Sequence, residues 1–288
     1  MASQTVAALP DLPAPRKHKR HISGWHFVLI PISIVFVIPF VQMFLSALSP
    51  ASELVLYPPP FIPSRLTLDG LIALFTQTDI VRWLINSAIV VCCAVGSHIV
   101  LCSLAGYGFA RLRFKGRNAG MLMIMATIMI PTQLLMIPTY IIFSKLQLVN
   151  TLGAAIVPWL TSAFGIFLMR QFFLSIPAEI EESGRIDGAN RLQIFWHLVL
   201  PLAKPALATL AIFALLDSWN DLVWPLIAIN NDNAFTVQLG IANFQSAHHI
   251  DWSMLMAGNV VATLPLLIFF MVAQKQFIET MTFSGLKG

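Results

Sequence analysis

Long apolar segments recur along the chain, and each is long enough to cross a membrane. They are nearly free of charged residues and occupy residues 24–46, 83–110, 118–144, 146–169, 201–226 and 252–274. A helix needs about 20 apolar residues to span the hydrocarbon core of a bilayer, and it satisfies its own backbone polar groups there. The pattern therefore predicts an all-α membrane protein, in which residues 22–288 form one domain of six transmembrane helices.

The composition agrees with this pattern, since 57% of the 288 residues are hydrophobic and only 10% are charged. A soluble domain has about 25% charged residues, so this chain has too few charges to cover a solvated surface. The same hydrophobicity excludes a largely disordered chain. The net charge of +4 does not indicate nucleic-acid binding, because the basic residues flank apolar segments.

Lysine and arginine are distributed unevenly between the connecting segments. If the N-terminus is cytoplasmic, 14 of the 17 basic residues lie on the cytoplasmic side, and the other three are Arg65, Arg82 and Lys145. Cytoplasmic segments of membrane proteins carry an excess of Lys and Arg, so we expect both termini to be cytoplasmic. We expect residues 1–21 to form a disordered basic tail. The apolar segment after it is too long for a cleaved signal peptide.

The sequence contains no recognisable catalytic or phosphate-binding motif. It has no G-x-x-x-x-G-K-[ST], H-E-x-x-H or G-x-S-x-G pattern. His248, His249 and Asp251 share one outer loop, which we interpret as solvated rather than as a metal site. The proline-rich segment 50–80 is expected to be a non-helical cap. We therefore predict that this chain is not an enzyme and holds no cofactor or metal of its own.

The cytoplasmic segment 175–200 has the local chemistry of a helix, a sharp turn and a second helix. Ser175 is a candidate N-cap and Pro177 suits a first helical turn. Three glutamates follow where the helix dipole favours anions: Glu179, Glu181 and Glu182. Gly188 is the expected stop, because glycine tolerates the left-handed conformation that ends many helices. A second helix resumes at residue 192. By composition alone, the segment could also be an amphipathic connector on the membrane surface.

This segment resembles the EAA loop of ABC-importer permeases. The matching residues are Glu182-Ser183-Gly184, Arg185-Ile186-Asp187-Gly188-Ala189 and Leu200-Pro201. The Ile-Asp-Gly-Ala sequence is similar to the carbohydrate-importer branch of that family. Further stretches resemble other motifs of the family: Ala105–Arg111, Phe114–Arg117, Trp219–Asp221, Trp224–Leu226 and Gly285–Gly288. Ser and Gly replace the usual Ala-Ala pair but remain small. Glycine costs about 1 kcal/mol of helix stability relative to alanine, so we expect this helix to need contact with its partner in order to be stable.

The resemblance implies the fold of a type I ABC-importer permease in the cell (inner) membrane of a bacterium or archaeon. It implies a second permease subunit, expected to be a different chain, and two ATPase subunits that bind ATP and Mg. An extracytoplasmic binding protein would deliver a sugar, an oligosaccharide or a sugar derivative. The helix at 177–187 would dock on one ATPase. The residues expected to couple ATPase motion to the spans are Glu179, Glu182, Ser183, Gly184, Asp187 and Gly188.

Polar residues inside the spans are candidates for the translocation path, because polar groups in a membrane are costly and usually functional. They are Asn86, His98, Gln133, Asp217, Trp219 and Asn220. Amides and carboxylates bond sugar hydroxyls, and an aromatic face covers the apolar side of the ring. Structural alternatives exist: Asn86 could bond a neighbouring helix, Trp219 could anchor at the membrane interface, and His98 could be a neutral packing residue. The second permease could also make all of the sugar contacts.

Three other functions remain open on the sequence. A permease for a non-sugar solute, such as a glycerol phosphate, an amino acid or a peptide, would have the same architecture. A proton-coupled secondary transporter needs an acid and a base deep in the spans, a requirement that only His98 and Asp217 loosely meet. A non-transporting membrane scaffold would leave the EAA-like loop unexplained.

Overall fold

The computed structural model describes residues 24–245 and 250–285. Regular structure in these residues is helical apart from one isolated β-bridge. The chain divides into two compact units, Met1–Gln42 and Met43–Gly288, and each is described by itself. The predicted tail at 1–21 lies outside the described residues.

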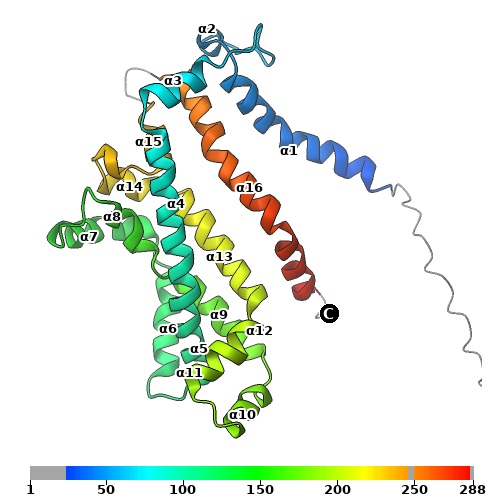
Figure 1. The fold of residues 1–288 in the computed structure, drawn as a ribbon, viewed down its shortest axis with the longest axis vertical. Helices are drawn as coiled ribbons and strands as arrows, with labels where there is room; N and C mark the ends of the chain where they lie inside the picture. Colours follow the sequence, from blue (N-terminus) through cyan, green and yellow to red (C-terminus); the bar gives the residue numbers. More distant parts are fainter. Residues whose placement is uncertain (1–23, 246–249, 286–288) are drawn as a thin grey trace, which may run out of the picture. The chain divides into compact units, whose positions relative to one another are not determined.

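Figure 1 shows the helices in chain order. They are α1 (His26–Ala47), α2 (Ala51–Leu54), α3 (Asp69–Gln77), α4 (Ile80–Ser97), η1 (His98–Cys102), α5 (Ser103–Arg111), α6 (Arg117–Ile128), α7 (Thr132–Lys145), α8 (Leu152–Ile156), η2 (Val157–Trp159), α9 (Ala163–Ser175), α10 (Glu179–Ile186), α11 (Arg191–Gln193), η3 (Ile194–Val199), α12 (Leu200–Leu202), α13 (Lys204–Trp219), α14 (Val223–Ala228), η4 (Asp232–Ala234), α15 (Val237–Ala242) and α16 (Trp252–Gly285). The turns η1 and η3 are π-helical, and η2 and η4 are 3₁₀-helical.

Four helical stretches of the described residues are long and apolar enough to cross a membrane singly. They are His26–Ala47, Ile80–Arg111, Leu152–Ser175 and Trp252–Met271. Two bent pairs bring the number to six if each pair is one span. They are α6 with α7, bent by 103°, and Arg191–Leu202 with α13, bent by 81°. The predicted all-α membrane fold is confirmed.

The predicted third span, 118–144, is not one straight helix. α6 ends at Ile128 and α7 begins at Thr132, directly after Pro131. Proline has no N–H to donate and disfavours a helical conformation in the residue before it. The apolar stretch is therefore divided into two helices that meet at a sharp bend.

The boundaries of other predicted segments also differ from those in the structure. The fourth span begins at Leu152 rather than 146, because Gln147 and Asn150 have φ of 56° and 65° and interrupt the helix. In the fifth, α13 begins at Lys204, where the chain bends after α12, and ends at Trp219 rather than at 226. The prediction of a non-helical cap at 50–80 is wrong in part, since this segment contains α2 and α3.

The second unit has two buried apolar clusters. The first is centred on the aromatic residues Trp83, Trp219, Trp224 and Phe235. The second gathers Tyr107, Met169, Phe173, Ile194 and Phe195. α5 packs closely on α9: a Cβ on Gly106 would lie 2.7 Å from the Cβ of Met169. The second cluster therefore joins the end of α5 to α9 and to η3, which follows α10.

Contacts between loops relate the ends of the two bent pairs to the ends of the span Ile80–Arg111. The amide N–H of Asn150 donates to Ala228 O at 2.9 Å, and the side chain of Asn86 donates to Asn233 O at 2.9 Å. These bonds place the start of α4, the loop after α7 and the loop after α14 at one end of the second unit. Arg111, at the other end of the span Ile80–Arg111, contacts Glu181 of α10. Since the two ends of a span lie on opposite sides, this arrangement agrees with the prediction that α6 with α7, and α11–α12 with α13, each carry the chain across.

Candidate functional site

α10 ends in a tight turn at Gly188, as predicted. The φ of Gly188 is 82°. Its N–H donates to Arg185 O at 3.1 Å, and the N–H of Ala189 donates to Gly184 O at 2.9 Å. These two bonds form a Schellman motif, which favours glycine because a side chain is strained in this conformation. The predicted N-cap at Ser175 is wrong: Ser175 ends α9, and α10 has no side-chain cap at its start.

A capping box begins the next helix immediately after this turn. The N–H of Gln193 donates to Asn190 Oδ1 at 2.9 Å, and the N–H of Asn190 donates to Gln193 Oε1 at 2.8 Å. The reciprocal pair satisfies two backbone donors that a helix start would leave free. The chain therefore reverses within residues 187–190, and both helix ends beside the turn are fixed by local hydrogen bonds.

α10 has one face turned to the protein and one face exposed. On the inner face, a Cβ on Gly184 would lie 2.6 Å from Leu198 Cδ1 and 3.2 Å from Ile194 Cγ1. Glycine at this position therefore permits close packing within the chain, whereas the sequence had suggested close packing against a partner. Ile186 at the tip is 86% exposed. The other exposed residues of α10 and the turn after it are Glu179, Glu182, Ser183, Arg185, Asp187 and Gly188.

A buried polar cluster joins α10 to α5. Glu181 Oε1 lies 2.9 Å from Arg111 Nε, and these side chains are only 4% and 15% exposed. The hydroxyl of Tyr107 donates to Glu181 Oε2 at 3.2 Å, and Arg185 Nη2 lies 3.5 Å from the same oxygen. A buried carboxylate is costly unless it is paired and hydrogen-bonded, and Glu181 has both kinds of partner.

Part of this cluster is visible in the sequence as the spacing of residues on two helix faces. Glu181 and Gly184 are three residues apart, so they share one face of α10. Tyr107 and Arg111 are four residues apart and share one face of α5. Two stretches that resemble separate family motifs therefore meet in one contact, which sequence spacing alone does not reveal.

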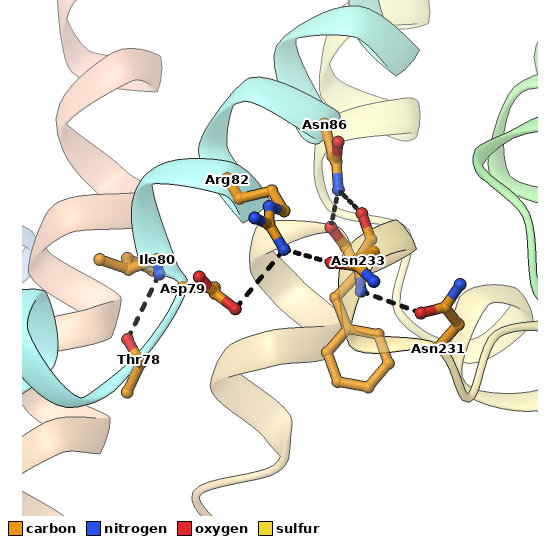
Figure 2. A network of polar contacts seen from close by, with 8 residues as sticks. Thr78, Asp79, Ile80, Arg82, Asn86, Asn231 and Asn233 are labelled. Atoms are coloured by element: carbon orange, nitrogen blue, oxygen red, sulfur yellow. Dashed lines mark hydrogen bonds and ion pairs between the residues drawn. The ribbon is translucent and has the colours of Figure 1, made fainter.

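Asn86, a predicted path residue, instead fixes a loop (Figure 2). Its amide donates to Asn233 O at 2.9 Å and to Phe235 O at 2.8 Å. Arg82 donates to Asn233 Oδ1 and lies 3.7 Å from Asp79 Oδ2. Asn86 is buried, and both amide protons are used by backbone carbonyls. These bonds give Asn86 a structural role, and its role in the path stays a prediction.

His98 and Trp219 are likewise bonded within the chain. His98 is buried, and its Nδ1 donates to Ala94 O at 2.7 Å. Trp219 is buried, and its Nε1 donates to Ala262 O of α16 at 3.2 Å. Asp217 and Asn220 are exposed in this chain, and the amide of Asn220 donates to Leu216 O at 2.8 Å. None of these four residues lines the cleft described next.

A cleft of about 600 Å³ lies between α6, α7, the segment 158–164 and the start of α14. Gln133, a predicted path residue, lines it. Asp221 and Trp159 also line the cleft, and Trp159 Nε1 donates to Asp221 Oδ2 at 3.1 Å. Hydroxyl groups complete the polar part of its wall: Thr127, Thr132, Thr139, Thr161 and Ser162. The cleft combines an amide, a carboxylate, hydroxyls and aromatic faces, which is the chemistry that binds polyhydroxylated solutes.

No group of three or more His, Cys, Asp or Glu side chains that could hold a metal is found in the described part of the chain. Asp251 belongs to that part. His248 and His249, the other members of the outer-loop group considered above, lie outside the described residues.

Comparison with known sequences matches this chain to transport proteins. The sequence model of the family described as binding-protein-dependent transport system inner membrane component matches residues 99–282. An arabinooligosaccharides transport system permease protein of Halalkalibacterium halodurans is 35% identical over 260 residues, which cover 89% of this chain and 93% of that protein. A lactose transport system permease protein of Rhizobium radiobacter is 29% identical over 254 residues, with coverages of 88% and 92%.

Comparison with solved structures gives the same architecture. A chain in the crystal structure of a bacterial ABC transporter involved in the import of the acidic polysaccharide alginate matches with a TM-score of 0.75 at 22% identity. The match covers 89% of this chain and 99% of that chain. A chain of a bacterial alginate ABC transporter, in complex with alginate pentasaccharide-bound periplasmic protein, matches with a TM-score of 0.60 at 16% identity, with coverages of 86% and 92%. At these identities the likeness concerns the fold.

Proposed function

Because this chain belongs to the family of binding-protein-dependent transport system inner membrane components, we propose that it is the permease subunit of an ATP-driven importer for a sugar or oligosaccharide. It is a multi-pass membrane protein. The sugar assignment is supported by relatives that are named for arabinooligosaccharides and lactose. The observation that carries the proposal is α10, a helix with an exposed tip whose inner face is held against the spanning helices.

Import would need partner subunits that supply energy and substrate. The sequence has no phosphate-binding loop, so two ATPase subunits would bind ATP and Mg on the cytoplasmic side. A second permease would complete the translocation path. An extracytoplasmic binding protein would deliver the sugar, and a structure of similar fold was solved with a sugar-bound periplasmic protein. The excess of Lys and Arg in the connecting segments supports a cytoplasmic position for α10.

The exposed face of α10 would be the ATPase-docking surface. Glu182, Ser183 and Asp187 offer polar contacts there, and Ile186 offers an apolar one. Closure of the ATPase pair on ATP would displace this surface, provided that α10 makes different contacts in the inward-open and outward-open states. Gly184 would act indirectly, by letting α10 lie close to Ile194 and Leu198.

The cleft lined by Gln133 and Asp221 would be this chain's part of the sugar path. Its amide and carboxylate can bond sugar hydroxyls, and Trp159 and Trp224 offer aromatic surface. Its volume of about 600 Å³ is within the usual range for a site that binds a small ligand.

The coupling role is tested by Gly188→Leu in the importer reconstituted with its partner subunits. A side chain at a φ of 82° adds strain of about 1–2 kcal/mol and shifts the exposed tip of α10. We expect membrane insertion to persist, and sugar uptake to fall to background while ATP hydrolysis no longer responds to the binding protein.

Gly116→Leu is the matched control for this experiment. Gly116 has a φ of 83° and, like Gly188, nothing within 4 Å of an added Cβ, but it lies in the loop between α5 and α6. It should suffer the same strain and keep uptake. Normal uptake in Gly188→Leu, with the ATPases retained after purification, would show that the segment 175–200 is an ordinary connector.

A further inference from the structure

A buried ion pair joins α10 to the membrane helices. We propose that the Arg111–Glu181 pair, oriented by Tyr107, passes a displacement of α10 to α5 and α9, so that both charged residues are positioning residues for transport. The inference rests on the proposed function and goes beyond it, since it names the contact at which motion enters the spans.

The guanidinium of Arg111 holds three helices at once. Arg111 is the last residue of α5. Its Nε lies 2.9 Å from Glu181 Oε1 on α10. Its Nη2 donates to Phe173 O of α9 at 2.7 Å, and also to Ile176 O just beyond the end of α9. The guanidinium is planar with donors in fixed directions, so α10 cannot shift along α9 without disturbing either the ion pair with Glu181 or the two hydrogen bonds to the end of α9.

Burial makes this contact harder to break than the others that α10 makes. The side chain of Glu181 is 4% exposed, so a separated carboxylate would be left in a poorly solvated site. The neighbouring contact of Gly184 with Ile194 and Leu198 is apolar and without direction, so it permits sliding. Arg185 is 55% exposed and more distant, at 3.5 Å, so solvent weakens its attraction. A displacement of α10 therefore carries Arg111 with it.

Tyr107 fixes the carboxylate from a second direction. Its hydroxyl donates to Glu181 Oε2 at 3.2 Å. Its ring packs edge-on against Phe173, with ring centroids 5.8 Å apart. The same ring also contacts Phe195, with ring centroids 5.1 Å apart. Phe173 belongs to α9 and Phe195 to η3, so the aromatic cluster ties the same carboxylate to the helices on both sides of α10.

The test is Glu181→Gln, which keeps the size of the side chain and removes its charge. Proteoliposomes would contain this chain, the second permease, the ATPases and the binding protein, with tritiated arabinotriose and lactose as probes. We expect ATP hydrolysed per sugar imported to rise about tenfold, a change of the size usual when coupling between two sites is lost. A contact that only stabilises the fold would lower the amount of inserted protein and leave this ratio unchanged.

A distance measurement gives an independent readout. Spin labels at Gly108→Cys and Ser183→Cys report the separation of α5 and α10, and Gly108 has open space for a label. The native cysteines would be replaced by serine. We expect the pulsed-EPR distance distribution to be narrow with Glu181 present and to broaden in Glu181→Gln.

Further variants separate the outcomes. Glu53→Gln makes the same chemical change at a partly exposed site in α2, where the carboxylate accepts from Ser64 and does not contact α10, and it should keep the wild-type ratio. Glu181→Asp retains the charge and should restore part of the coupling.

If Glu181→Gln does not insert, Tyr107→Phe provides the test instead, because it removes only one hydroxyl and should raise the ratio of ATP to sugar by less. An unchanged ratio and distance distribution in the inserted variants overturns the proposal. If the unaltered importer moves neither probe with ATP, the proposed function fails instead.

Discussion

Polar side chains in the spans fall into two groups: those that bond the backbone of distant segments and those that line a cleft. Asn86 donates to two carbonyls that lie 147 and 149 residues further along the chain, and Trp219 donates to one on α16. No local pattern in the sequence encodes partners at such separations, so these residues could be recognised as unusual but not as structural. Gln133 was predicted on the same grounds, and it does line a cleft.

The role of the cleft is tested at this scale by Gln133→Ala. If the amide bonds a sugar hydroxyl, its loss should cost about 1 kcal/mol and raise the half-saturating sugar concentration about fivefold. Uptake measured over a concentration series, with inserted protein quantified, checks this. Asn259→Ala is the control, since the amide of Asn259 bonds only Leu255 O of its own helix. An unchanged half-saturating concentration in Gln133→Ala would remove this residue from the path.

Helices and turns were predictable where the signal is local. Gly188 ends α10 because its two turn bonds need a positive φ, and glycine in this position is readable from the sequence. The bend at Pro131 was not readable, because other prolines of the chain lie inside helices. Pro138 is within α7 and Pro265 within α16. Whether a proline breaks an apolar helix depends on whether neighbouring helices supply hydrogen bonds to the backbone groups that the proline frees. These partners are set by tertiary structure and cannot be read from the local sequence.

The bend raises a question that labelling answers: whether α6 and α7 together cross the membrane. The loop contacts favour a crossing, because Asn150 bonds Ala228, whereas Arg111 bonds Glu181 of α10. In a cysteine-free background, Leu146→Cys, which follows α7, should react with an impermeant maleimide from outside intact cells. Lys115→Cys should react only in inverted vesicles. Tyr57→Cys, at a fully exposed position in the predicted outer segment, is the positive control. Reaction of Leu146→Cys and Lys115→Cys from the same side would show a re-entrant pair and remove one span.

At the scale of the whole molecule, the fold class followed from composition and from the spacing of apolar segments. The family resemblance rested on short stretches around Gly184 and Trp219. The sequence did not show that Glu181 and Arg111 meet, since contacts between distant segments form only when α5, α9 and α10 are packed. The pair connects the surface proposed to meet the ATPase with the helices proposed to form the path. We therefore expect the energy of ATP hydrolysis to enter this protein through α10.

The most direct test is to measure sugar uptake under different energy sources in proteoliposomes that contain the complete importer. The probes are tritiated arabinotriose and lactose, each supplied with the binding protein. We expect uptake only when hydrolysable ATP is present on the side that bears α10, none with a non-hydrolysable analogue, and no effect of a protonophore. Uptake driven by a proton gradient without ATP would contradict ATP-driven import and would favour a proton-coupled transporter.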